Sequence, residues 1–221
     1  MANIIGKFGS KFAETIIGTA DNDTIWPRGG YDLVDGGAGV DTVVIEANRA
    51  KFSIARDGHL TYVDTISAAS SGDQLRVRNV ERLAFTDAKV ALDLEPTQAA
   101  GQAALLIGAV LGRSTVIGNK ELMGAGIALF DQGLSMLDLS AAVMRLPIWG
   151  DLAGGSSNTE IASYLLTVVH GHAPTGAELD TAVNAMANEP QGDFLARLAL
   201  SGPNVMQVDL VGLAKQGLMF S

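Results

Sequence analysis

The chain has 221 residues, a formal net charge of −9 and a pI near 4.7. This acidic balance argues against sequence-independent binding of nucleic acid, which needs a basic face. The sequence contains no cysteine, which excludes disulfides, thiolate metal sites and cysteine catalysis.

A nine-residue repeat is the first pattern along the chain. Residues 9–44 divide into the blocks GSKFAETII, GTADNDTIW, PRGGYDLVD and GGAGVDTVV. The first residue of each block is a turn former, the sixth is acidic and the eighth is aliphatic. The acidic residues are Glu14, Asp23, Asp32 and Asp41. This period predicts a turn of six residues followed by a short strand of three, with every second block stacked on the same side.

The residue types of these turns favour a hard cation. Glycine allows the turn backbone to direct carbonyl oxygens inward, which residues with a Cβ resist. The acidic sixth residue adds a carboxylate, and calcium takes about six to eight such oxygen ligands. The aliphatic eighth residue is expected to point between two layers of strands. Because that core is thin, we expect metal binding and folding to be coupled.

Residues 42–94 are expected to continue as strands. Phe52 and Ile54 alternate on one side of Asp57-Gly58, and Leu60 with Tyr62 on the other, which predicts a β-hairpin. Segments 75–77 and 80–85 alternate in the same way, with a small polar loop at 67–72 before them.

The composition changes at Pro96, and helical periods follow. Thr175 and Glu178 have capping-box spacing, and prolines mark several boundaries. The most apolar run, 103–111, is about half the length that crosses a bilayer, so no membrane span is expected. The predicted helices are 98–112, 119–132, 136–146, 159–170, 175–188, 191–200 and 204–216.

The blocks resemble the repeat-in-toxin (RTX) family of calcium-binding nonapeptide proteins, because the last one nearly matches G-G-x-G-x-D-x-U-x. Residues 79–87, NVERLAFTD, resemble the strand segment that often follows such repeats, and 97–221 resembles a helical domain of unknown function found in the same proteins. The resemblance implies export by type I secretion machinery with an uncleaved C-terminal signal. It agrees with an N-terminus that lacks the apolar core of a signal peptide.

The family's ligand positions transfer to two pairs of blocks. Blocks two and four bring Asp23 and Asp41 together, and blocks one and three bring Glu14 and Asp32 together. The second pair departs from the family pattern, since Phe12 and Pro27-Arg28 replace turn glycines, although Gly29-Gly30 could shift the turn. The expected metal ligands are Asp23, Asp41, Asp21, Gly18, Gly36, Gly39, Glu14, Asp32 and Gly30.

Together these patterns predict an α+β protein with a calcium-binding β-roll and strand segment at 1–95 and a helical domain at 97–221. The predicted function is binding, in a secreted protein that acts at the cell surface or in the matrix, where surface polysaccharide or a protein is its partner. Two alternatives stay open: an extracellular enzyme with its site in the helical domain, and an export or anchoring module for a partner protein. Against an enzyme, no nucleophile–base motif is visible in the sequence.

Overall fold

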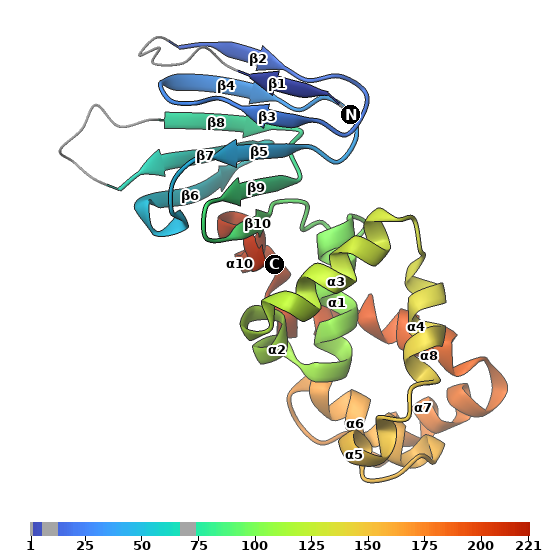
Figure 1. Ribbon diagram of the computed structural model, residues 1–221. Coiled ribbons are helices and arrows are strands. Elements are labelled where there is room, and N and C mark those ends of the chain that lie inside the picture. The colour runs from blue at the N-terminus through green and yellow to red at the C-terminus, as the bar shows by residue number, and fades with distance from the viewer. Residues whose placement is uncertain (1, 6–12, 67–73) are drawn as a thin grey trace. The chain divides into compact units, whose positions relative to one another are not determined.

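The computed structural model describes residues 2–5, 13–66 and 74–221, so Met1, 6–12 and 67–73 lie outside the described residues. The chain divides into two compact units, Met1–Leu94 with Gly212–Ser221 and Glu95–Val211. The first unit is built of strands and the second of helices (Figure 1). The predicted α+β class is therefore confirmed.

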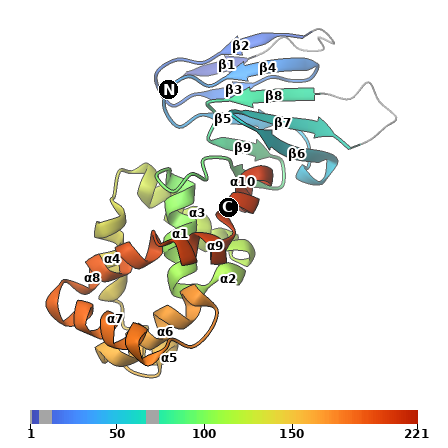
Figure 2. The same ribbon diagram turned by 180° about the vertical axis from the view of Figure 1, so that it is seen from behind.

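Two sheets form the strand-rich unit. One has the order β1-β3-β5-β9-β10-β11 and the other the order β2-β4-β8-β7-β6. Figure 2 shows β2, β4, β8 and β7 in succession within the second sheet. The strands are β1 Asn3–Ile5, β2 Thr15–Ile17, β3 Thr24–Trp26, β4 Tyr31–Asp35, β5 Thr42–Ile45, β6 Phe52–Asp57, β7 Leu60–Thr65, β8 Gln74–Arg78, β9 Arg82–Phe85, β10 Lys89–Ala91 and β11 Leu218–Phe220.

The nine-residue period appears directly in the strand register. Ile16 of β2 faces Val34 of β4, and Ile25 of β3 faces Val43 of β5, both in parallel pairs. Successive blocks therefore alternate between the two sheets, as the repeat predicts. These four aliphatic side chains are buried in one core cluster.

Beyond the repeats, the predicted hairpin is confirmed. Strands β6 and β7 pair antiparallel from Phe52↔Thr65 to Asp57↔Leu60, and Gly58 in the turn has φ +57°. Strand β8 then joins the second sheet next to β4, whereas β9 joins the first sheet next to β5. The strands after the repeats thus extend both sheets.

The last strand comes from the other end of the chain. Strand β11 pairs antiparallel with β10, with Ala91 opposite Leu218 and Lys89 opposite Phe220. Gly217 turns the chain into β11 at φ +75°, and a Cβ there would lie 2.3 Å from Val90 Cγ1. Residues 212–221 consequently belong to the strand-rich unit, whereas the sequence predicted a helical domain that continues to 221.

The helical unit follows the predicted periods closely. Capping boxes start three of its helices, at Ser135, Ser157 and Thr175. The predicted helix at 204–216 is instead divided, because Asp209 adopts a left-handed conformation with φ +58°. The helices are α1 Ala99–Leu111, α2 Arg113–Gly118, α3 Lys120–Asp131, α4 Met136–Met144, α5 Trp149–Ala153, α6 Asn158–His170, α7 Gly176–Asn188, α8 Gln191–Ala199, α9 Gly202–Val208 and α10 Leu210–Gln216.

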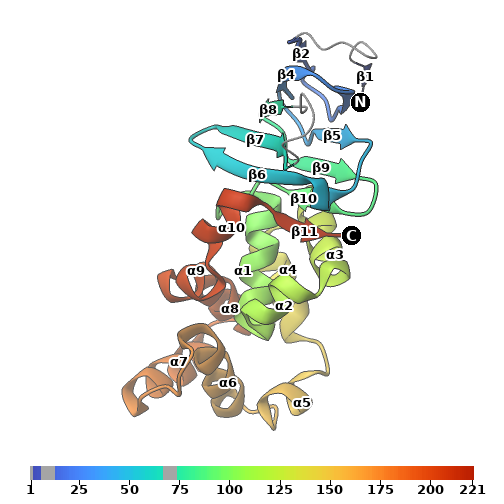
Figure 3. The same cartoon turned by 90° about the vertical axis from the view of Figure 1, so that its left-hand side faces the viewer.

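Helix α1 is the centre of this unit and lies against α3, α6, α8 and α9 (Figure 3). A buried polar contact fixes part of this packing, since Asn204 Nδ2 donates to the carbonyl oxygens of Leu105 at 2.8 Å and Ala199 at 2.7 Å. Within the part of the chain that the structure describes, no helix has the length and apolarity needed to cross a membrane.

Candidate metal site in the stacked turns

The turns 18–23 and 36–41, from blocks two and four, lie one on the other. The N–H of Ala38 donates to Thr19 O at 3.2 Å, and the N–H of Val40 donates to Asn22 Oδ1 at 2.9 Å. The structure therefore brings together the two turns that the sequence predicts as a pair.

Glycine is required where these turns touch. A Cβ on Gly18 would lie 1.8 Å from Gly36 O, and a Cβ on Gly37 would lie 2.1 Å from Thr19 O. Gly37 and Gly39 also have φ of +100° and +119°, a region that side chains disfavour. The two backbones thus approach closely, and carbonyl oxygens of one turn face the other turn.

The sixth residues of the blocks form a ladder of carboxylates. Asp41 Oδ1 accepts a hydrogen bond from the N–H of Asp23 at 2.7 Å, and Asp23 Oδ1 accepts one from the N–H of Ala2 at 2.8 Å. In the other layer, Asp32 Oδ1 accepts from the N–H of Glu14 at 3.1 Å. Each carboxylate therefore accepts a hydrogen bond from the backbone of the preceding turn or strand on its own side of the unit.

Both side-chain oxygens of Asp23 have donors, and those of Oδ2 lie within its own turn. Its Oδ2 accepts from the N–H and the hydroxyl of Thr19, at 2.6 and 2.9 Å. The hydrogen bond from the Thr19 N–H is the main cause that lowers the pKa of Asp23, despite the opposing effect of burial. The ionised form of this carboxylate is thus favoured.

Asp41 differs from Asp23 in one decisive respect. Its side chain is 0% exposed, and no hydrogen-bond partner of Oδ2 is found among the described residues. Burial raises the pKa of Asp41, the hydrogen bond from the Asp23 N–H lowers it, and the charges of Asp23 and Asp35 raise it further. A buried carboxylate oxygen without a donor is costly, and a bound cation would remove that cost.

The donor set fits a calcium ion, since it consists of carboxylates and turn carbonyls. Within the described ranges, no group of three or more His, Asp or Glu side chains gathers closely enough to hold a metal. Backbone oxygens must therefore supply a large share of the ligands, as the glycine-lined contact between the turns allows.

The second predicted pair is built differently. Asp32 is buried and reaches the backbone of Glu14, but residues 9–12 of the first block, Phe12 among them, lie outside the described residues. The loop before β4 has positive φ at Arg28, Gly29 and Gly30, and Gly30 O accepts from the N–H of Gln74 at 2.9 Å. The loop that contains Pro27-Arg28 therefore has a backbone conformation different from that of the turns 18–23 and 36–41.

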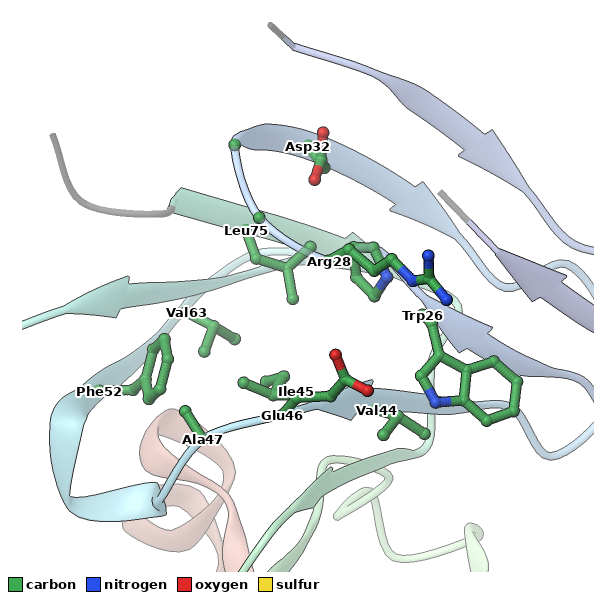
Figure 4. A pocket seen from close by; sticks show the side chains of 13 residues that line it. Trp26, Arg28, Asp32, Val44, Ile45, Glu46, Ala47, Phe52, Val63 and Leu75 are labelled. Atoms are coloured by element: carbon green, nitrogen blue, oxygen red, sulfur yellow. The ribbon is translucent and has the colours of Figure 1, made fainter. Parts of the chain in front are cut away.

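A pocket of about 210 Å³ lies beside this loop, lined by residues of both sheets. Figure 4 shows Trp26 and Arg28 at one end of it and Phe52 and Val63 at the other. The sequence does not predict this pocket, because the residues that line it come from segments that belong to no single repeat.

Sequence reasoning also missed a role for Glu81. Its Oε2 accepts from the N–H of Asp41 at 2.8 Å, so it continues the carboxylate ladder. Burial is the main cause that raises the pKa of Glu81, and the charge of Asp41 raises it as well. An acidic residue directly before an alternating strand, as in Asp41-Thr42-Val43, was the available signal.

Comparison with known proteins identifies the repeats. Residues 8–43 match the family described as RTX calcium-binding nonapeptide repeat, with four copies. No curated protein matches the chain. The matched residues lie in the strand-rich unit, so the match does not extend to the resemblance expected for the helical domain. Since RTX nonapeptide repeats bind calcium, the four blocks of this chain are a calcium-binding segment of that type.

Proposed function

We propose that the chain is a secreted calcium-binding protein whose strand-rich unit holds calcium between the turns 18–23 and 36–41. The observation that carries the proposal is the close stacking of the two turns, in which a Cβ on Gly18 would lie 1.8 Å from Gly36 O and 3.0 Å from Asp23 Oδ2. RTX repeats are typically structural or binding elements, which supports a binding role over catalysis.

The proposed ligands are the carboxylates of Asp23 and Asp41, with backbone oxygens near Gly18, Gly36 and Gly39. Asp21 lies in the same turn as Asp23 and is a further candidate. Calcium would supply the positive charge that this column of acids lacks, and would tie two turns together that otherwise rest on few hydrogen bonds. For the pair Glu14 and Asp32, with Gly30, we propose a weaker site, because the loop at 27–30 departs from the stacked geometry.

Calcium titration of the whole chain by isothermal calorimetry tests this function directly, with magnesium as the control ion. Binding to the native state stabilises it by mass action, by about 2.7 kcal/mol at a free concentration of 100 times Kd. We expect calcium to bind and chelation to lower the melting temperature of the strand-rich unit. A chain that binds no calcium at millimolar concentration would refute the proposal.

Export is the second part of the proposal. Proteins with RTX repeats are typically secreted, and free calcium is scarce inside cells and plentiful outside, so weak sites fill after release. We propose action at the cell surface or in the matrix, on polysaccharide or a partner protein. The test is expression with a type I exporter: the protein is expected in the medium with its N-terminus intact. Retention in the cells despite a working exporter would contradict this route.

A further inference from the structure

The segment before β9 takes the place of a third stacked turn, although it lies outside the matched repeats. The N–H of Gly36 donates to Arg78 O at 3.0 Å, as the N–H of Gly18 donates to Asp35 O at 2.7 Å. A Cβ on Gly36 would lie 1.9 Å from Asn79 O, just as a Cβ on Gly18 would lie 1.8 Å from Gly36 O. Asn79 therefore occupies, in the next stacked segment, the position that Gly36 occupies in the turn 36–41.

Glu81 stands in the same layer where an aspartate would be expected. The N–H of Asp41 donates to Glu81 Oε2 at 2.8 Å, as the N–H of Asp23 donates to Asp41 Oδ1 at 2.7 Å. The next hydrogen bond repeats too, since the N–H of Arg82 donates to Asp41 O at 3.0 Å and that of Thr42 to Asp23 O at 2.8 Å. Glu81 is thus the structural equivalent of the repeat's sixth residue.

This third layer is shortened. The chain passes from Asn79 to Glu81 with a single residue between them, whereas four residues separate Gly36 from Asp41. Asn79 makes the sharp change of direction with φ +50°. The longer side chain of glutamate suits a layer whose backbone takes a shorter course, and the missing turn residues end the stack here.

Oxygen atoms of two layers meet at this place. A Cβ on Gly36 would lie 2.6 Å from Asp41 Oδ2 and 1.9 Å from Asn79 O, so both oxygens lie over the same α carbon. Asp41 Oδ2 is the buried oxygen for which the described residues offer no donor. The carboxylate of Glu81 joins them through its bond to the N–H of Asp41.

The neighbouring arginines pair with other carboxylates. Arg78 Nη2 pairs with Asp35 Oδ2 at 2.8 Å, and Arg82 forms a buried ion pair with Asp93. Arg82 also lies close to Glu81, since its Nη1 donates to the backbone oxygen of Glu81 at 2.9 Å.

We propose that Glu81 is a calcium ligand, and that an ion lies between the turn 36–41 and the segment 79–81, held by Asp41, Glu81 and the carbonyl oxygen of Asn79. This inference rests on the proposed function and adds to it a site outside the four repeats. The short segment closes the column and gives the last repeat a partner that the nonapeptide pattern does not provide.

The test is the number of calcium ions bound to the whole chain, measured by native mass spectrometry and calorimetry. Glu81→Gln keeps an acceptor for the Asp41 N–H and removes only the charge, so we expect a folded protein that binds one ion fewer than the wild type. Glu46→Gln, at an exposed glutamate, is the matched control and is expected to bind as the wild type does.

The outcomes separate the two proposals. A wild type that binds no calcium overturns the proposed function, whereas a wild type that binds calcium and a Glu81→Gln variant with unchanged ion number and affinity overturn this inference alone. Circular dichroism checks that Glu81→Gln is folded. If it is not, Glu81→Asp keeps the charge but shortens the reach, and is expected to weaken one site; unchanged binding by that variant would equally overturn the inference.

Discussion

Replacing Asp41 by asparagine should change stability in opposite directions with and without calcium. The carboxylate is fully buried, and the structure shows no partner for its Oδ2 within the described ranges. An unsatisfied buried polar group costs about 1–3 kcal/mol, and more when it is charged. Asparagine keeps an oxygen for the Asp23 N–H and places an amide where Oδ2 was, near Asn79 O. Without calcium, Asp41→Asn should therefore stabilise the strand-rich unit.

With calcium the order should reverse. The wild type gains about 2.7 kcal/mol at 100 times Kd, and Asp41→Asn should lose most of that gain because a ligand charge is gone. Each kcal/mol shifts the melting temperature of a unit of this size by about 4–8 °C. The variant is thus expected to melt several degrees above the wild type in chelator and several degrees below it in calcium.

Tryptophan fluorescence can follow this unit alone. The chain has two tryptophans, and a Trp149→Phe background leaves Trp26, at the end of the strand that follows the turn 18–23, as the reporter. Asp57→Asn, at an exposed aspartate, is the matched control and should change neither melting temperature. If Asp41→Asn shifts the melting temperature in the same direction in both conditions, the reasoning about an uncompensated buried charge is wrong.

Three further outcomes are expected. Gly18→Ala should destabilise the strand-rich unit by about 1–3 kcal/mol or more in urea unfolding, because its Cβ would lie 1.8 Å from a carbonyl oxygen. Gly58→Asn is the control and should cost less, because Gly58 lies in open space and has a left-handed conformation that asparagine tolerates. The raised pKa values of Asp41 and Glu81 mean that the folded state binds protons more tightly than the unfolded state at these two carboxylates. Calcium-free stability should therefore rise as the pH falls from 7 toward 4.5, the ordinary pKa of glutamate, and calcium affinity should fall over the same range. A calcium-free melting temperature that falls over this range would contradict the prediction. Asn204→Ala should lower the stability of the helical unit by about 1–3 kcal/mol, because two buried carbonyls lose their donor, and calcium titration should show unchanged binding; altered calcium affinity would show that the units are coupled.

The repeat could be predicted because its physical cause is local. A six-residue turn and a three-residue strand return every second block to the same layer, and this fixes the pairing of Ile16 with Val34 and of Ile25 with Val43. The helical half was similarly readable, since capping residues such as Thr175 lie within one turn of the helices they start.

What the sequence did not reveal depends on distant or conformational features. Glu81 follows Asp41 by 40 residues, and no repeat connects them, so only the pairing of β5 with β9 brings them together. Asp209 breaks the predicted helix without a glycine or a proline. Strand β11 has three residues, too few for an alternation to be significant, and only its partner β10 makes it a strand.

The pairing of β11 with β10 makes the helical unit an insertion within the strand-rich one. The sheet acquires its final strand only after the whole helical segment has been synthesised, whereas the helices form from contacts nearer in sequence. Closing such a long loop is entropically costly and slow. Until β11 pairs, Val90 and its neighbours in β10 present an unpaired edge of the sheet, which Leu218–Phe220 then cover.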